Sequence, residues 1–305
     1  MQSFAQRVRY RFRSHRQWQV KGAALAFLGV PKGAVLTVRM VPFDRNATRR
    51  KEVTALPEKL VTRGIVLRAT ETKESDYILT VLTAEHGRLA VIARGARRKN
   101  SRLAAACQLL AFSELVLYRR GDWYMLDEGS TVTLFDGLRA DLEKLSLASY
   151  FAEMTETVTA EDVPCAEILS LLLNALYALD TLGKDPALVR AAFELKLLSL
   201  SGYEPLLADC AMCGAAEPAE PVFDAAQGVV LCRKCAGPSG GAPLDAGALA
   251  AMRHIVGAPA KRMLAFALEP PSRARLSAAC EVFVTAQLDR RFKTLDFYKS
   301  IKLTE

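Results

Sequence analysis

Two hydrophobic patterns follow one another along the chain, and one gives way to the other near Gly137. Before this point, short runs rich in Val, Ile, Leu, Thr and aromatic residues are separated by turn sequences such as Ser75-Asp76, which is typical of strands. Five such runs within about 75 residues predict a small β-barrel. The predicted strands are Leu60–Ala69, Tyr77–Thr83, Arg88–Arg94, Leu109–Tyr118 and Trp123–Phe135.

Beyond Gly137, apolar residues recur every three or four positions, as they do on the buried face of a helix. Asp185-Pro186 has the composition of a helix start, and Gly202 is a suitable stop. The segment 165–182 is apolar on most of its surface, which predicts a central place in a helical bundle. The predicted helices are residues 138–160, 165–182, 185 to the stop at Gly202, 245–256 and 272–294.

The two patterns predict a multidomain protein of the α+β class. Residues 1–57 form a basic leader in which apolar residues follow neither the helix nor the strand spacing for long. Residues 58–137 form the barrel domain, and residues 138–305 form the helical domain. We favour a leader that is disordered or wrongly included, because Met40 is a plausible internal start. A cationic tail that folds on nucleic acid is the alternative.

The charge of this chain of 305 residues is unevenly distributed. The formal net charge is +8, but residues 1–60 hold 13 Lys and Arg against three acids, which leaves 28 basic and 30 acidic side chains in the rest. Contact between the body of the protein and a polyanion must therefore come from a local patch. No apolar stretch reaches the roughly 20 residues of a membrane span, and no secretory signal is evident, so we predict a cytoplasmic protein without a membrane segment.

Such a patch is present between Ala93 and Arg102, at the end of the third predicted strand. Gly95, Asn100 and Ser101 suit a loop there. A loop of cations without acids can contact phosphates, so we predict a nucleic-acid contact, with a solvated surface loop as the alternative. The five candidate residues are Arg94, Arg97, Arg98, Lys99 and Arg102.

Among five-stranded barrels the OB-fold is the favoured candidate, and its open face commonly binds single strands through aromatic side chains. Alternation along a strand places about half of such side chains in the core. Trp123 and Tyr124 are adjacent and face opposite ways, so at most one of them can stack on a base. The barrel aromatics are Tyr77, Phe112, Tyr118, Trp123 and Tyr124.

The most specific motif is a pair of C-x2-C knuckles separated by 18 residues, formed by Cys210, Cys213, Cys232 and Cys235. Four thiolates can close a tetrahedron around Zn²⁺ without an open position, so we predict a structural zinc site in segment 208–240; four unligated cysteines are the alternative. Seven cysteines, an odd number, fit a metal site in a reducing cytoplasm better than a disulfide framework. The other three, Cys107, Cys165 and Cys280, lie on apolar stretches and are predicted core residues.

Motifs for catalysis are absent from the sequence. None of the histidines, His15, His86 and His254, has a Ser or Cys partner in a triad-like motif, and there is no H-E-x-x-H or Walker-type loop. We therefore predict a binding protein and no enzyme. Zinc-assisted hydrolysis, which requires an open coordination site, is the enzymatic alternative.

Several segments, in the right order over about residues 59–300, resemble the RecO family of recombination mediators. Segments similar to the family's amino-terminal barrel are Thr62–Arg68, Asp76–Thr80, Gly87, Ala93–Arg98 and Ser101-Arg102. Segments similar to its helical part are Ser201–Pro205, Cys210–Gly214 and Phe223–Cys235. The leader departs from the family, whose members usually start within a few residues of the first strand, and this puts the start codon in doubt.

The resemblance implies an OB-fold barrel followed by an α-helical domain with a zinc-ribbon-like insertion. It also implies a non-enzymatic, nucleoid-associated role in DNA repair and recombination. The family binds single- and double-stranded DNA, anneals complementary strands, and works with RecR to load RecA onto DNA coated by single-strand binding protein, whose tail is a further partner.

By this resemblance the family's basic barrel loop corresponds to Arg94, Arg97, Arg98, Lys99 and Arg102, and its zinc ligands to the four knuckle cysteines. The alternative is a zinc-ribbon RNA-binding or transcription-associated module, because a barrel and knuckles alone do not separate DNA from RNA.

Overall fold

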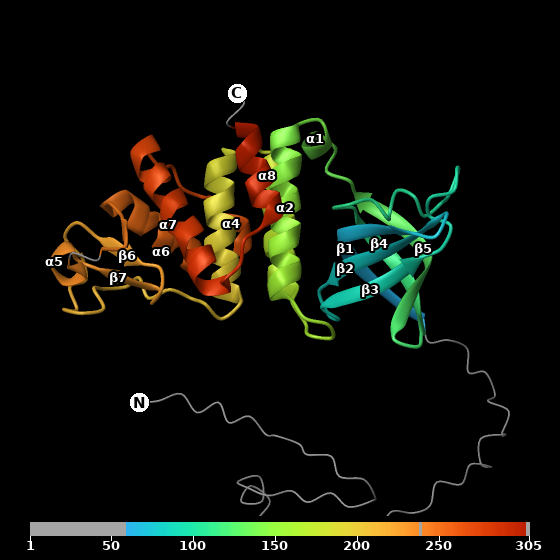
Figure 1. Cartoon of the computed structure of the whole chain (residues 1–305), viewed down its shortest axis with the longest axis horizontal. Coiled ribbons are helices and arrows are strands. Elements are labelled where there is room, and N and C mark those ends of the chain that lie inside the picture. Colours follow the sequence, from blue (N-terminus) through green and yellow to red (C-terminus); the bar gives the residue numbers. More distant parts are fainter. Residues whose placement is uncertain (1–58, 238–239, 303–305) are drawn as a thin grey trace, which may run out of the picture. The chain divides into compact units, whose positions relative to one another are not determined.

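The structure is a computed structural model that describes residues 59–237 and 240–302, all within one compact unit. The predicted leader, residues 1–57, lies outside the described residues. Figure 1 shows the order of the elements: five strands form a barrel, and helices follow, with a small second sheet placed between them in sequence.

The five predicted strands are present and close into a barrel of order β1-β2-β3-β5-β4. All neighbouring pairs are antiparallel except β3 and β5, which run parallel. This arrangement confirms the predicted OB-fold. The strands are β1 (Lys59–Thr72), β2 (Asp76–Thr83), β3 (Arg88–Ala93), β4 (Phe112–Arg120) and β5 (Trp123–Thr133).

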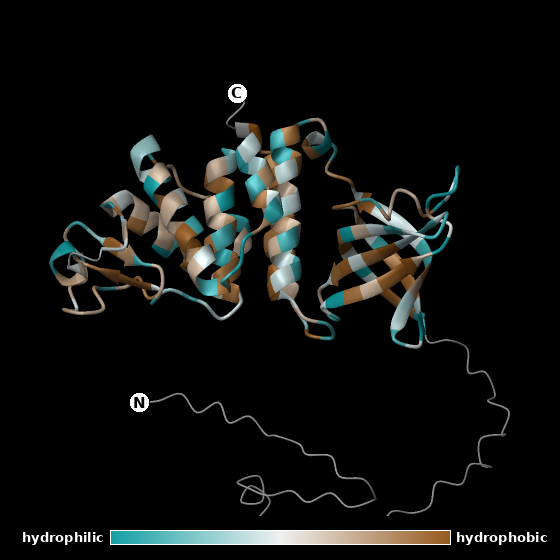
Figure 2. Cartoon of the chain, viewed as in Figure 1, coloured by the Kyte–Doolittle hydropathy of each residue, from teal (hydrophilic) through white to brown (hydrophobic). Residues whose placement is uncertain are grey.

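Alternation of side chains builds the interior of the barrel. Leu89, Val91 and Ala93 of β3 point inward, while the residues between them are partly exposed. Figure 2 shows that hydrophobic and hydrophilic residues are both present along the barrel strands. A Cβ atom on Gly64 of β1 would lie 2.5 Å from Cγ1 of Val81 on β2. These strands pack closely only because position 64 lacks a side chain.

The helices follow the predicted order, but the bounds of two of them differ from the prediction. The predicted helix 138–160 is divided, because Asp141 is extended and its carboxylate accepts a hydrogen bond from the Lys144 amide (3.1 Å), which starts a new helix. The predicted helix 272–294 ends early at Leu288, since Asp289 takes a left-handed conformation. The helices are α1 (Asp136–Arg139), α2 (Leu142–Val158), α3 (Ala166–Asp180), α4 (Pro186–Leu200), α5 (Arg233–Ala236), α6 (Ala246–Gly257), η3 (Ala260–Arg262), α7 (Pro270–Leu288) and α8 (Lys293–Lys302).

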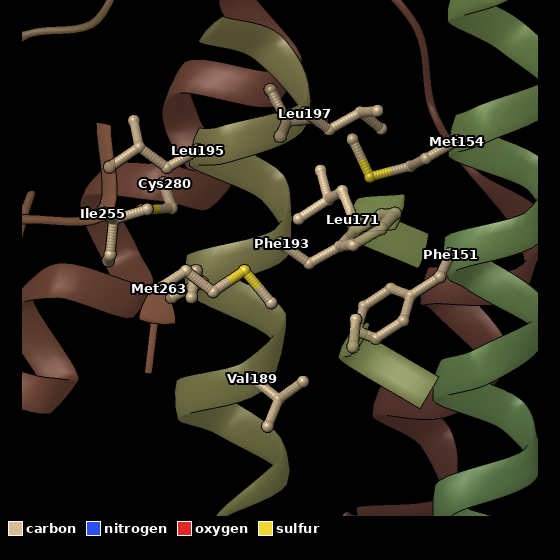
Figure 3. Close-up of a cluster of buried hydrophobic side chains, with 14 of the residues drawn as sticks. Phe151, Met154, Leu171, Val189, Phe193, Leu195, Leu197, Ile255, Met263 and Cys280 are labelled. Carbon is tan, nitrogen blue, oxygen red and sulfur yellow. The ribbon is translucent and has the colours of Figure 1, made fainter. Parts of the chain in front are cut away.

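The central helix of the bundle is α4. The prediction that segment 165–182, which forms α3, takes the central place is wrong. Every residue of α4 from Leu188 to Leu198 is buried, and the helix packs against α2, α3, α6 and α7. Figure 3 shows part of this core, in which Phe193 of α4 stacks on Phe151 of α2 with ring centroids 4.1 Å apart. In contrast, α3 leaves 48% of Tyr177 exposed.

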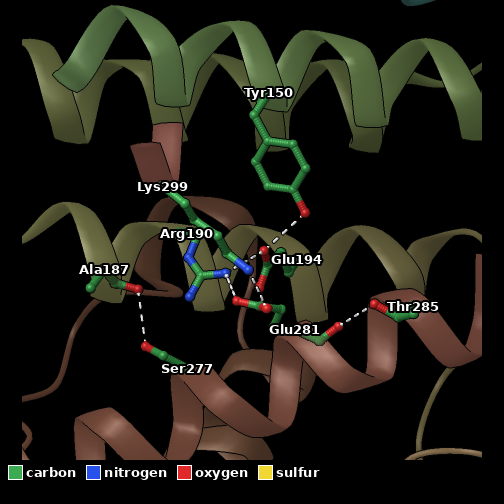
Figure 4. Close-up of polar contacts among 8 residues, drawn as sticks. All are labelled: Tyr150, Ala187, Arg190, Glu194, Ser277, Glu281, Thr285 and Lys299. Carbon is green, nitrogen blue, oxygen red and sulfur yellow. Dashed lines mark hydrogen bonds and ion pairs between the residues drawn. The ribbon is translucent and has the colours of Figure 1, made fainter. Parts of the chain in front are cut away.

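A polar network crosses the same core, because α4 also buries charged residues. Arg190 contacts the carboxylates of Glu194 (3.1 Å) and Glu281 (3.0 Å), and the Tyr150 hydroxyl donates to Glu194 (2.9 Å) (Figure 4). Lys299 of α8 pairs with Glu281. Burial raises the pKa of Glu194 to about 7, although the positive charge of Arg190 acts to lower it. The network joins α2, α4, α7 and α8.

The barrel and the helical part meet along α2 and the segment that follows it. Arg88 of β3 donates to the backbone carbonyl of Glu156 (2.7 Å), and Arg68 of β1 pairs with the Glu156 carboxylate (2.9 Å). A Cβ atom on Gly87 would lie 2.4 Å from the Val163 carbonyl oxygen, so the β2–β3 turn lies directly against the segment after α2.

No helix in the described part of the chain is long and apolar enough to cross a membrane.

Candidate nucleic-acid interface and metal centre

The backbone of residues 94–102, here called the cationic loop, is fixed to the barrel. It leaves the end of β3, and two of its amides bond where β2 begins: Gly95 N–H donates to the carboxylate of Asp76, the first residue of β2 (2.8 Å), and Arg97 N–H donates to the carbonyl of Ser75 in the β1–β2 turn (3.0 Å). Gly95 and Asn100 have φ values of 64° and 68°, a region that glycine and asparagine tolerate best. The loop predicted from these residue types is present and held in place.

The segment after the cationic loop returns to the barrel and anchors its other end. Ala106 and Cys107 are buried in the barrel core. Gly129 of β5 makes room for this segment, since a Cβ atom there would lie 2.7 Å from the Ala106 side chain. Both ends of the cationic loop are therefore fixed, while its middle projects into solvent.

Arg97 differs from the other cations of the loop. Its guanidinium pairs with the carboxylate of Glu71 on β1 (2.6 Å) and lies 5.9 Å from the ring centroid of Tyr77. Only 30% of its side chain is exposed. Arg97 therefore ties the loop to the barrel, and its charge is largely neutralised there.

The other four cations are exposed and unpaired within the described ranges 59–237 and 240–302: Arg94, Arg98, Lys99 and Arg102. Side chains of this kind attract phosphates electrostatically without distinguishing bases. The arrangement provides an unneutralised positive surface on a loop whose two ends are fixed to the barrel.

The structure also separates the barrel aromatics by their surroundings. Tyr77 lies beneath Arg97, Phe112 packs against the helical core, and Tyr124 packs against the barrel core. Trp123 is 40% exposed, so the prediction that it and Tyr124 face opposite ways is confirmed. Tyr118 of β4 is partly buried.

The four knuckle cysteines come together in the helical part, as their spacing predicts. Their sulfur atoms all lie within 4.8 Å of one another, and those of Cys213 and Cys232 are 3.9 Å apart. A tetrahedron of sulfurs around zinc at about 2.3 Å has edges of about 3.8 Å, so the donor set fits this ion. None of the four forms a disulfide.

Two tight turns and a small sheet position these thiols. Gly214 has a φ of 71° and its amide donates to the Cys210 carbonyl (2.8 Å), which closes the first knuckle. The second knuckle begins α5, where the Cys235 amide donates to the Cys232 carbonyl (3.0 Å). The supporting sheet has the order β7-β6-β8 and consists of β6 (Val222–Asp224), β7 (Val229–Leu231) and β8 (Ala242–Pro243).

Hydrogen bonds make the four thiols chemically unequal. Backbone N–H groups, first that of Cys213 and then that of Cys232, lower the pKa of Cys210 to about 6. Hydrogen bonds with the thiols of Cys232 and Cys213 raise the pKa of Cys235 to about 12. A cation at the centre of the cluster would favour the thiolate form of all four, since thiolates are the metal-binding species.

Arg253 of α6 fastens the first knuckle to the helical core. Its guanidinium donates to the carbonyls of Leu207 (2.8 Å), Ala208 (2.9 Å) and Ala216 (2.9 Å), which lie on both sides of the knuckle, and pairs with Glu217 (3.1 Å). Sequence reasoning missed this residue because it is distant from the cysteines along the chain and belongs to no motif.

The remaining cysteines have the properties of core residues. Burial raises the pKa of the Cys107 thiol to about 12 and that of Cys280 well above its ordinary value. Cys165 is partly buried, burial raises its pKa as well, and its thiol bonds to the Thr83 carbonyl (3.1 Å). A raised pKa makes a thiol a poor nucleophile, which agrees with the predicted packing role.

Together these features define an OB-fold protein in which a helical domain with a four-cysteine insertion follows the barrel. Residues 58–135 match the family Recombination protein O N terminal, and residues 139–296 match Recombination protein O C terminal. The chain belongs to the RecO family, as the resemblance implied.

Curated relatives cover the same region of the chain. A protein of Anaeromyxobacter sp. (strain K) is 38% identical over 242 residues, which are 78% of this chain and 95% of the relative. One of Acetivibrio thermocellus is 31% identical over 243 residues, or 79% of this chain and 97% of the relative. One of Symbiobacterium thermophilum is 32% identical, over 78% of this chain and 96% of the relative. All three bear the name DNA repair protein RecO.

Proposed function

We propose that this protein is a non-enzymatic mediator of DNA repair and homologous recombination that binds single- and double-stranded DNA and anneals complementary strands. The observation that carries the proposal is the set of exposed, unpaired cations on a loop fixed to an OB-fold barrel. Family membership and the name of the relatives support a role in DNA repair.

Annealing requires a surface that screens two phosphate backbones and leaves the bases free to pair. Arg94, Arg98, Lys99 and Arg102 meet this requirement, because contacts with phosphates carry no sequence information. Arg97 holds the loop through Glu71 and Tyr77. Anchoring reduces the conformational entropy that the loop would lose on binding.

The family also supports proposals about partners and location. We infer that the protein works in the cytoplasm, at the nucleoid, with RecR and the tail of single-strand binding protein, and that it helps to load RecA onto coated DNA. Family membership is the support for these partners.

For the cysteine cluster we propose structural zinc held by Cys210, Cys213, Cys232 and Cys235. The ion would cross-link the two knuckles and stabilise a segment with little core of its own. X-ray absorption should give four sulfur ligands. An oxygen ligand in its place would favour the hydrolytic alternative, because a catalytic zinc site needs an open position.

The test of the proposed function is the annealing of complementary single strands, bare and coated with single-strand binding protein. The full-length protein should accelerate annealing in a salt-sensitive way, and Arg98→Ala with Lys99→Ala should slow it. Lys261→Ala with Arg262→Ala is the matched control, since both residues are adjacent, exposed cations on the helical part. If annealing is absent, or if both double variants are equally slow, the proposal fails.

The RNA-binding alternative is tested with the same proteins. Affinity for an RNA strand and for a DNA strand of the same sequence should be similar if the loop contacts phosphates alone. A strong preference for RNA together with absent annealing would favour a zinc-ribbon RNA-binding module instead.

A further inference from the structure

The turn between β4 and β5, residues 119–123 and here called the hairpin turn, carries an exposed aromatic side chain. Trp123 is the first residue of β5, pairs with Arg120 across the hairpin, and is 40% exposed. Its neighbour Tyr124 is turned to the barrel core. The barrel therefore presents an indole ring to solvent that its own packing does not use fully.

Two arginines of β4 are near this residue in the hairpin: Arg120 is paired with Trp123 across the strands, and Arg119 with Tyr124. Arg119 and Arg120 are exposed, and Arg119 Nε donates to the Gly121 carbonyl (3.3 Å), which turns the side chain back over the turn. Neither arginine forms an ion pair with any residue that the structure describes, and Asp122 is the single acid within the turn. Lys59, next to Tyr118, is already paired with Asp127 (3.2 Å).

The hairpin turn lies apart from the cationic loop. Strands β3 and β5 run parallel, with Val91 beside Tyr124. The turn that precedes β5 is therefore near the end of the sheet at which β3 begins, whereas the cationic loop leaves the other end of β3. The two positive segments are separated along this pair of strands.

We propose that the hairpin turn is a second contact for single-stranded nucleic acid, in which a base stacks on Trp123 and neighbouring phosphates contact Arg119 and Arg120. The inference rests on the proposed function and extends it to a surface with different chemistry. An indole can stack on a base of any identity, but the base must be unpaired. This contact therefore selects single strands over duplexes, whereas the phosphate contacts of the cationic loop do not.

The chain itself provides a direct test, because it has only two tryptophans, Trp18 and Trp123. In the full-length Trp18→Phe variant, the indole fluorescence comes from Trp123 alone. A thymidine oligonucleotide should quench this fluorescence, because a stacked base contacts the ring. Inorganic polyphosphate of similar charge, which has phosphates but no bases, should bind and leave the fluorescence nearly unchanged.

Two failures can be told apart in this titration when a fluorescent label on the oligonucleotide reports binding. If the labelled strand binds while the Trp123 fluorescence is constant, the stacking proposal is wrong and the proposed function stands. If the strand does not bind at all, both are wrong. Quenching by a protein partner but not by the oligonucleotide would assign the turn to protein docking and overturn the proposal.

Substitution gives an independent readout. Trp123→Ala should weaken single-strand binding about tenfold and leave duplex affinity almost unchanged, while Trp123→Phe should retain most of the affinity. Tyr177→Ala is the matched control, since Tyr177 is a similarly exposed aromatic residue on α3 (48%). Equal losses for single strands and duplexes, or no loss in a Trp123→Ala protein of normal melting temperature, would contradict the assignment.

Discussion

Arginine is used in opposite ways in the cationic loop and in the core around α4. In the loop, Arg94, Arg98 and Arg102 are exposed and have no carboxylate partner among the described residues. In the core, Arg190 is buried and lies between Glu194 and Glu281. The loop keeps a positive potential that can attract a ligand, whereas the charge of Arg190 is neutralised by the two carboxylates.

This difference follows from the cost of desolvation. A buried charge must be paired because it has lost its water, but an exposed cation keeps its hydration and can remain unpaired. The same residue type therefore supports folding in one place and binding in the other. Arg97 is intermediate, since it is partly buried and paired with Glu71.

Removal of the buried arginine should have the largest effect. Arg190→Met leaves Glu194 buried without its positive partner, so we expect the free energy of unfolding to fall by about 3–5 kcal/mol. Arg98→Met is the matched control and should change it by less than about 0.5 kcal/mol. Urea unfolding measures both. Equal effects of the two substitutions would remove the distinction between the regions.

Arg253 tests a third use of arginine, the anchoring of a metal-binding turn. Arg253→Ala removes the hydrogen bonds to Leu207, Ala208 and Ala216, and loss of such supporting contacts typically lowers metal affinity about 10- to 100-fold. Competition with a chromophoric chelator measures the affinity of the zinc-loaded protein. Arg262→Ala, which removes an exposed arginine of η3, should not change it, and equal affinity in both variants would show that the anchor is unimportant.

The pH dependence of stability should reveal a smaller effect of the same network. The pKa of Glu194 rises from 4.5 to about 7 on folding, so the folded state binds more protons between these values and this residue's contribution to stability falls as pH rises through them. Glu194→Gln does not titrate, so its stability relative to the wild type should rise by on the order of 1 kcal/mol from pH 5 to pH 7.5.

Glu281→Gln is the control for that comparison. Burial opposes its ionisation, but the hydrogen bond and charge of Lys299 and the charge of Arg190 outweigh this and lower the pKa of Glu281. Its contribution to stability is present above its ordinary pKa and is lost as pH falls below it, so from pH 5 to pH 7.5 the variant should differ from the wild type by a constant amount. A parallel Glu194→Gln profile would show that Glu194 stays ionised.

The fold could be predicted to the extent that it depends on local patterns. Alternation gave the barrel strands, and helical spacing gave most helices. The break at Asp141 and the end at Leu288 were missed, because the apolar spacing continues through both and the interruption depends on a single capping or left-handed residue. The central position of α4 was missed because Arg190, Glu194 and Lys196 make it appear more polar than α3.

The candidate sites could be predicted where their residues are neighbours in sequence. The cationic loop and the two knuckles are local motifs, and the structure brings the four knuckle cysteines together. Their supports are distant in sequence: Asp76 and Glu71 hold the loop, and Arg253 holds the first knuckle. For the same reason, no sequence pattern distinguished the paired Arg97 from the unpaired Arg98.

The most direct test of the central claim is the salt dependence of single-strand affinity for the wild type, for Arg98→Ala with Lys99→Ala, and for Lys261→Ala with Arg262→Ala. Each lost phosphate contact on a single strand reduces the slope of log K against log salt by about 0.7, so the loop variant should lose about 1.4 and bind all sequences more weakly. The control should keep the wild-type slope. A loop variant with unchanged affinity and slope would contradict the assignment of the cationic loop as the phosphate-binding surface.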